Sequence, residues 1–152
     1  MSLFNLTRLP HTTCTASSTY PDYPCTLAID GLVADNKQWT SMGEKDGAWI
    51  NIIFPGPVLI KTIKIWPRCA LYDQFRTLVF EFSDGSHAKI TAHCSTNRDF
   101  RNCDDPDLLI SFDLTAYVVT KWVKLTGYDS CDPTTGNNGF MELIYLGMVL
   151  FD

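Results

Sequence analysis

The chain has 152 residues, of which 45% are hydrophobic and 19% are charged, and its formal net charge at pH 7 is -5. This length and composition predict one compact domain spanning residues 1–152, with enough apolar residues for a single continuous core. The twelve Lys and Arg residues are scattered along an acidic chain, so we expect no nucleic-acid partner, and the same balance disfavours anionic membrane lipid.

Segments rich in β-branched and aromatic residues recur along the chain and alternate with turn signals. The first regular element that we predict is a short helical turn at 25–30. The predicted strands follow in the order 48–54, 58–66, 77–82, 87–91, 108–114, 117–126 and 142–150. Glycine, proline and asparagine mark turns between them, at PGP (55–57), SDGS (83–86) and DPTTGNNG (132–139). Strands without intervening helices predict an all-β fold, an antiparallel β-sandwich or barrel.

Alternating patterns within these strands predict which side chains enter the core. Trp39 and Trp49 are large enough to fill the space between two sheets that pack about 10 Å apart. Lysines 64, 121 and 124 are expected to point outward from their strands.

Six cysteines, at positions 14, 25, 69, 94, 103 and 131, are more than a cytosolic domain of this size usually contains. None shows the Cys-x-x-Cys spacing of a zinc site, so we expect at least one disulfide. Cys94 and Cys103 bracket a polar segment, STNRDFRN, and are predicted to pair if that segment returns on itself. The other four cysteines are not paired from the sequence, and buried free thiols are the alternative. Disulfides predict an extracellular or secreted protein, although residues 1–10 lack the pattern of a secretion signal.

Six motifs occur in a characteristic order: ASSTYPDYPCTLAIDG (16–31), WTSMGEKDGAWINIIF (39–54), VLIKTIKIWPR (58–68), LVFEFSDGS (78–86), KWVKLTG (121–127) and FMELIYLG (140–147). Together they resemble the coagulation factor V/VIII C-type, or discoidin-like, domain of the galactose-binding-like jelly rolls. The resemblance extends over about residues 12–147. It implies a jelly-roll sandwich, a fold that hosts lectins, carbohydrate-binding modules, lipid-binding modules and adhesion domains.

The resemblance also implies a ligand site on three loops at one end of the sandwich, corresponding to residues 42–46, 68–75 and 135–140. These loops contain hydrogen-bonding and aromatic side chains that suit a sugar. The candidate ligand-binding residues are Glu44, Arg68, Tyr72, Asp73, Gln74, Asn137 and Asn138. Phe140 is a second candidate for stacking on a sugar ring. Arg68 has an alternative role, in which it only fixes the following loop by pairing with Asp73.

A structural calcium ion is also implied by the resemblance, where the AIDG turn meets the last strand. The matching carboxylates are Asp30 and Glu142, and Asp35 with carbonyl groups of residues 31–37 could complete the six to eight oxygens that calcium prefers. The sequence departs from the family pattern at Lys37, where a hydroxyl is common. The Lys37 ammonium could replace the ion by pairing with Asp30 or Glu142.

Sequence and resemblance together predict a non-catalytic ligand-binding module with a glycan or glycoprotein as its partner. The alternative is a protein–protein interaction or cell-adhesion domain that uses the same loops. Exposed apolar residues at 42, 71, 72 and 75 could insert into a membrane, but neighbouring acidic residues oppose this. No enzyme is expected, because the three histidines show no nucleophile-and-base spacing and nothing in the sequence raises the pKa of one carboxyl in a Glu44–Asp73 pair.

Overall fold

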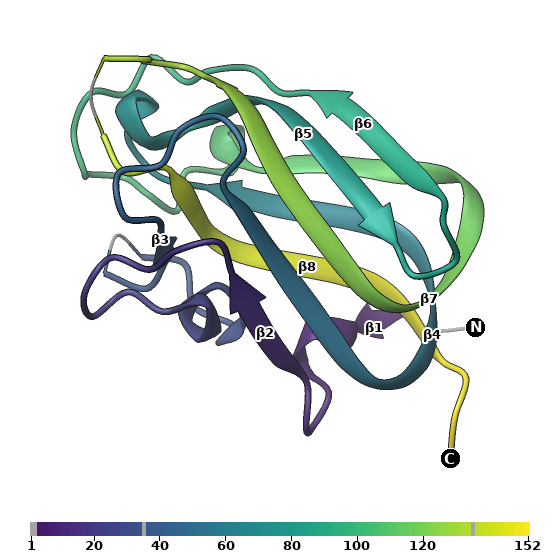
Figure 1. Ribbon diagram of the computed structural model, residues 1–152. Helices are drawn as coiled ribbons and strands as arrows, with labels where there is room; N and C mark the ends of the chain where they lie inside the picture. Colours follow the sequence, from purple (N-terminus) through teal and green to yellow (C-terminus); the bar gives the residue numbers. More distant parts are fainter. Residues whose placement is uncertain (1–2, 35, 135) are drawn as a thin grey trace.

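The computed structural model describes residues 3–34, 36–134 and 136–152 and shows an all-β antiparallel sandwich (Figure 1). The strands are β1 (Phe4–Asn5), β2 (Thr13–Ala16), β3 (Trp39–Thr40), β4 (Trp49–Pro67), β5 (Phe75–Phe82), β6 (His87–Thr91), β7 (Ile110–Ser130) and β8 (Gly139–Val149). Four 3-10 turns lie between them: η1 (Leu6–Arg8), η2 (Cys25–Ile29), η3 (Leu71–Asp73) and η4 (Pro106–Leu108). None of these described helical turns has the length and apolarity needed to cross a membrane.

Two long strands, β4 and β7, belong to both layers of the sandwich. The first half of β4 pairs with β2 and with the second half of β7, which β5 and then β6 extend. The second half of β4 pairs with the first half of β7 and with β8, and β1 and β3 flank β8. Hydrogen bonding is therefore continuous through the order β1-β8-β4-β7-β5-β6, and the two bent strands join the layers.

The segment Pro55-Gly56-Pro57 is the bend in β4 and not the turn that we predicted. The pairing register with β7 breaks between Ile53 and Val58, which matches the loss of two backbone donors at the prolines. A side chain at Gly56 would meet the Phe151 ring at 2.6 Å, so the bend packs tightly against the C-terminal segment. The two strands predicted at 48–54 and 58–66 are thus one strand, and those at 108–114 and 117–126 are likewise one.

Strand alternation decides which tryptophan enters the core. Trp39 is fully buried and stacks on Phe140 with ring centroids 6.1 Å apart, as predicted for a residue between the sheets. Ile50 and Ile52 point inward and are fully buried, so Trp49 points outward and is only half-buried. The prediction that Trp49 fills the core is therefore wrong, and its ring instead lies under the Lys124 ammonium, 4.9 Å from the Nζ atom.

Three disulfides pair Cys14 with Cys25, Cys69 with Cys103 and Cys94 with Cys131. The predicted Cys94–Cys103 bridge is wrong, because each of these cysteines is bonded to a different partner. Cys94 follows β6 and Cys131 follows β7, and these two strands lie on either side of β5. Neighbouring strand ends therefore bring Cys94 beside Cys131.

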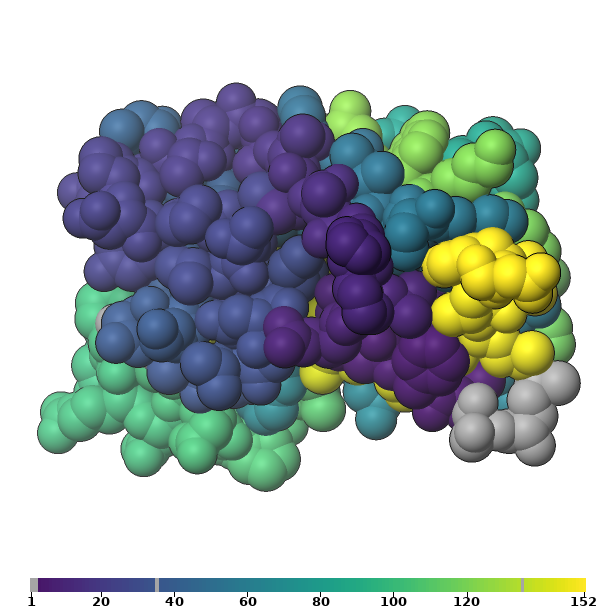
Figure 2. Space-filling view, turned by 90° about the horizontal axis from the view of Figure 1, so that it is seen from below, coloured from purple at the N-terminus to yellow at the C-terminus, as the bar shows by residue number. Residues whose placement is uncertain are grey.

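Residues 92–109, which connect β6 to β7, form a projecting loop at one end of the molecule. Figure 2 shows this loop in green beside the purple and blue N-terminal segment, which covers most of the face in view. Three bridges in a small domain are typical of proteins that mature in an oxidising compartment.

Peptide mapping under non-reducing conditions should recover the pairs 14–25, 69–103 and 94–131. Replacing both Cys94 and Cys131 by serine should lower the free energy of unfolding by about 2–4 kcal/mol, measured by urea denaturation. A peptide that links Cys94 to Cys103 would contradict the strand arrangement described here.

Candidate functional site

Three loops meet at the end of the sandwich where β4 ends and β5 and β8 begin, and we call them the rim loops: residues 42–46, 68–75 and 136–140. The Arg68 Nη1 atom donates to the backbone oxygen of Asn137 at 3.0 Å. The Asn138 N–H donates to the backbone oxygen of Glu44 at 3.3 Å. The expectation that the three loops share one end is confirmed by these contacts; Thr135 lies outside the described residues.

An ion pair between Arg68 and Asp73 lies at the centre of the rim loops. The Nη2 atom of Arg68 lies 3.3 Å from an Asp73 oxygen, and both side chains are almost fully buried, with exposed fractions of 9% and 6%. Arg68 also donates to the Thr40 hydroxyl at 3.3 Å, and Asp73 accepts the Asn137 N–H at 2.9 Å. The pair therefore holds the second and third rim loops and β3 together, as the alternative role for Arg68 anticipated.

Gly136 lets the third loop approach the second. Its φ is +94°, and a Cβ there would lie 2.3 Å from the Tyr72 carbonyl oxygen and 2.4 Å from an Asp73 carboxylate oxygen. Both contacts exclude any larger residue, because neither the backbone nor the ion-paired carboxylate can move away. The glycine of the predicted DPTTGNNG turn thus determines how closely these loops pack.

Gln74 and Asn138 were expected to contact a ligand, but their side chains are buried beneath the rim loops, with exposed fractions of 2% and 0%. The Gln74 amide donates to the Arg68 carbonyl at 2.8 Å and accepts the Ser95 N–H at 2.9 Å. The Asn138 amide donates to the Gln74 carbonyl at 3.0 Å and to the Ser130 hydroxyl at 3.1 Å. Both residues therefore position the loops, and neither side chain is accessible to a ligand. Phe140 is buried as well, so it has no exposed ring for a sugar.

Glu44 belongs to a rim loop, but its carboxylate is held away from Arg68. The Oε1 atom accepts hydrogen bonds from the hydroxyls of Ser17, at 2.7 Å, and Ser18. The Ser18 hydroxyl also accepts the Met42 N–H at 2.9 Å. Glu44 therefore fastens its loop to the segment after β2, and only its Oε2 atom lacks a protein donor among the described residues.

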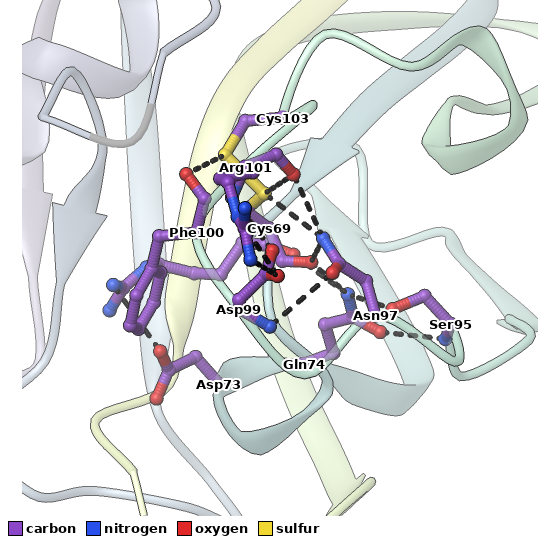
Figure 3. The surroundings of a disulfide bond; sticks show 10 residues. Cys69, Asp73, Gln74, Ser95, Asn97, Asp99, Phe100, Arg101 and Cys103 are labelled. Atoms are coloured by element: carbon purple, nitrogen blue, oxygen red, sulfur yellow. Dashed lines mark hydrogen bonds and ion pairs between the residues drawn. A yellow bond between two sulfur atoms is a disulfide. The ribbon is translucent and has the colours of Figure 1, made fainter.

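Phe100 is the functional candidate that the sequence analysis missed. Its ring is 49% exposed and lies 5.9 Å from the Arg68 guanidinium carbon, measured to the ring centroid. Figure 3 shows Phe100 beside Asp73, at the end of a loop anchored by the Cys69–Cys103 disulfide. The Asn97 side chain strengthens this anchor by donating to the backbone oxygens of Cys69, at 3.3 Å, and Arg101, at 3.1 Å (Figure 3). The only signal in the sequence was a lone aromatic residue in a polar segment between two cysteines.

The exposed part of this arrangement is an open depression of about 460 Å³. The ion pair lies at its floor, and the polar backbone of the third loop borders one side. Two aromatic residues flank it, the half-buried Tyr72 and the exposed Phe100. Its lining comprises Arg68, Tyr72, Asp73, Phe100, Gly136 and Asn137. Such a surface offers flat apolar faces beside hydrogen-bonding groups and lacks the deep apolar cavity of a typical small-molecule site.

The predicted calcium region lies where the AIDG turn meets β8. Glu142 is 1% exposed, and its Oε2 atom accepts the Gly31 N–H at 2.6 Å. Its Oε1 atom is buried without a hydrogen-bond partner in the described part of the chain. The pKa of Glu142 is raised to about 8, chiefly because burial disfavours the charged carboxylate. The Gly31 N–H hydrogen bond opposes this rise, the Asp30 carboxylate adds to it, and Arg8 opposes it. An orphaned, buried carboxylate oxygen is what a cation would satisfy.

The residues present therefore fit a calcium ion, although the side chains alone do not make a site. Across residues 3–34, 36–134 and 136–152 there is no cluster of three acidic, histidine or cysteine side chains that could hold a metal. Backbone carbonyls would have to supply most ligands, and Asp35 lies outside the described residues. The alternative is not seen, because no ion pair joins Lys37 to Asp30 or Glu142 among the described residues.

Comparison with known families gives one match. Residues 9–145 match the model of a family described as a domain of unknown function, DUF7402. No curated protein matches the chain.

Solved structures share the fold at low sequence identity. The family 32 carbohydrate-binding module of NanJ from Clostridium perfringens, solved with galactose, has a TM-score of 0.72 and 16% identity over 95% of this chain and 98% of its own. A fucolectin from the serum of the striped bass, Morone saxatilis, has a TM-score of 0.72 and 13% identity over 97% of this chain and 50% of its own. A fucose-binding module from Streptococcus pneumoniae has a TM-score of 0.64 and 14% identity over 97% and 98%. The discoidin-like jelly roll predicted from the six motifs is thus confirmed as the fold.

The raised pKa of Glu142 predicts a specific pH dependence when no cation is bound. In the folded protein the carboxyl keeps its proton up to about pH 8, whereas the unfolded chain releases it near 4.5. The folded state therefore binds more protons in this window, and the free energy of unfolding should fall as pH rises from about 4.5 to 8. Urea denaturation in chelator across this range tests this, with Glu142→Gln as the control that loses the slope. Equal slopes in both proteins would contradict the account.

Proposed function

The chain belongs to the DUF7402 family, and we propose that it is a non-catalytic module that binds carbohydrate in the depression between Tyr72 and Phe100. The observation that carries this proposal is the combination of two aromatic faces with a fixed polar floor. A sugar ring has one apolar face of C–H groups and an edge of hydroxyls, so it needs both kinds of contact at once. Tyr72 and Phe100 would contact the ring face, while Asp73 and the Asn137 side chain would meet hydroxyls.

The contacts around the depression indicate that it is already formed before a ligand binds. Arg68 is committed to Thr40, Asp73 and Asn137, so its charge orients the floor and leaves little of the guanidinium for a ligand. The Cys69–Cys103 bridge fixes the loop that presents Phe100. A site that is already ordered loses less conformational entropy on binding, which helps a small ligand.

The ligands of proteins with the same fold favour carbohydrate over other classes. The NanJ module was solved with galactose, and the pneumococcal module is described as fucose-binding. A protein ligand on the same rim loops is the second candidate, because Arg68 and Phe100 would also suit a protein interface. The depression is small and polar-floored, which favours a sugar.

Catalysis is not part of the proposal. Hydrolysis of a glycosidic bond needs a protonated carboxyl opposite a charged one. In the rim loops Asp73 is held by the Arg68 guanidinium, and the Glu44 carboxylate faces Ser17 and Ser18. Neither carboxylate is placed to donate a proton across the depression. The three disulfides add support for an extracellular location, where glycans are the accessible partners.

A structural calcium ion is the second part of the proposal. Glu142, Asp30 and backbone carbonyls of the following loop would hold it. When bound, the ion supplies positive charge to the orphaned Glu142 oxygen. The loop leads directly into β3, whose Thr40 hydroxyl accepts a hydrogen bond from Arg68, so an ordered loop would also support the depression.

Binding to a glycan array tests the main proposal. The protein should bind at least one glycan saturably, and Phe100→Ala should weaken that binding about tenfold, because the more exposed of the two aromatic faces at the depression is lost. The matched control is Tyr117→Ala, which removes an exposed aromatic residue from the bend of β7 at the other end of the sandwich. Signals on no glycan, or equal losses in both variants, would reject carbohydrate binding at this depression and favour the protein-ligand alternative.

Thermal unfolding in calcium and in chelator tests the second part. At calcium a hundredfold above its dissociation constant, binding should add about 2.7 kcal/mol to the free energy of unfolding. Glu142→Gln should remove most of this increment, while magnesium at the same concentration should give little, since it dehydrates reluctantly. A calcium increment that survives in Glu142→Gln would place the ion elsewhere.

A further inference from the structure

Trp122 borders a second hollow, on the outward face of the layer formed by β2, β4, β7, β5 and β6. Val123 and Leu125 point into the core and are fully buried, so the alternation of β7 directs Trp122 outward. Its ring is half-buried. The hollow beside it measures about 460 Å³ and lies between β5, the β5–β6 hairpin turn and Trp122. None of its lining residues belongs to the depression at the rim loops.

Two exposed polar side chains face this hollow from neighbouring strands. Glu81 on β5 pairs in register with His87 on β6, so both point to the same face as Trp122. Within the described residues, neither side chain has a hydrogen-bond or ion-pair partner. Glu81 offers acceptors, and His87 offers one donor and one acceptor when neutral. Val79, two residues before Glu81, extends the apolar floor.

Hydrogen bonds from backbone N–H groups to side-chain hydroxyls hold the hairpin turn against β7. The Ser83 N–H donates to the buried Thr120 hydroxyl at 2.8 Å, and the Lys121 N–H donates to the Ser83 hydroxyl at 2.7 Å. At the tip, the Ser86 N–H donates to the Asp84 carboxylate at 2.8 Å. The distance between the hairpin and Trp122 is therefore fixed before any ligand arrives.

We propose that this hollow is a second carbohydrate-binding subsite, which takes a neutral pyranose ring of an oligosaccharide stacked on Trp122. An aromatic face next to a carboxylate and an imidazole matches the apolar face and hydroxyl edge of a pyranose. Lys124 lies opposite Glu81 in register on β7, so the two opposite charges offset each other and a neutral sugar suits the hollow. The apolar lining comprises Trp122, Val79 and the buried Phe82, which is small for a protein interface. This inference rests on the proposed function in taking carbohydrate as the ligand class, but it uses different residues.

The two sites lie at opposite ends of β5. Phe75 begins this strand beside the rim loops, and Phe82 ends it beside the hollow, so the strand separates them by about 23 Å. One monosaccharide cannot contact both sites. An oligosaccharide or a dense glycan surface that engaged both would bind more tightly than either site alone, because the second contact becomes intramolecular.

NMR titration of the ¹⁵N-labelled protein separates the two sites. Galactose, cellotriose and triacetylchitotriose serve as probes. We expect at least one to shift the amide signals of residues 81–87 and the Trp122 indole signal saturably, apart from any response at residues 68–73. Trp122→Ala should weaken the response at the hollow at least about tenfold. Glu81→Gln, at an exposed position, should weaken it about threefold without affecting folding. Phe100→Ala should leave it unchanged.

The outcomes distinguish this inference from the function on which it rests. Saturable shifts confined to the rim loops would overturn the second subsite and leave the first. Shifts at the hollow that persist in both Trp122→Ala and Glu81→Gln would also overturn it, since neither group would contact the sugar. No saturable response at the hollow with any of the three probes would also overturn the second subsite, whereas the site at the rim loops is decided by the glycan array.

Discussion

The buried ion pair between Arg68 and Asp73 determines the shape of one end of the sandwich. Arg68 extends from the end of β4, Asp73 precedes β5, and the two residues together bind the loop before β8 and the hydroxyl on β3. Removing one partner of such a pair leaves a charge buried without compensation, which typically costs about 3–5 kcal/mol. The main role of the ion pair is therefore structural. It holds together the end of β4, the residues before β5, the loop before β8 and β3, and the depression lies above these four segments.

Covalent bridges extend this arrangement to the loop that carries Phe100. Cys69 directly follows Arg68, and its bond to Cys103 ties the projecting loop to the same point of β4. The Cys94–Cys131 bond ties the start of the same loop to the end of β7. An exposed aromatic residue on a long polar loop would otherwise sample many positions. Here the disulfides hold it beside the guanidinium, so both aromatic sides of the depression are set by the fold.

Much of the fold could be predicted from the sequence, because strand patterning and turn residues are local signals. The gathering of the three rim loops came from a resemblance in motif order and was confirmed by their hydrogen bonds. The prediction for Trp49 was wrong because alternate residues of β4 face the core. Ile50 and Ile52 occupy the inward positions, so Trp49 faces outward. The Cys94–Cys131 pair depends on β5 lying between β6 and β7, and no local spacing encodes that order.

The candidate site residues differ in whether a ligand can reach them, and residue type alone does not predict this difference. Gln74 and Asn138 have amide side chains that could form hydrogen bonds with a sugar. Both amides instead donate to backbone carbonyl groups of the surrounding loops. Phe100 was not predicted, because a lone aromatic residue in a polar segment has no periodic pattern.

The central claim is that a sugar binds above the Arg68–Asp73 pair. A crystal structure of the protein with its strongest array glycan tests it most directly. The account predicts a sugar ring against Phe100 and Tyr72, and a ring bound away from both residues would contradict it.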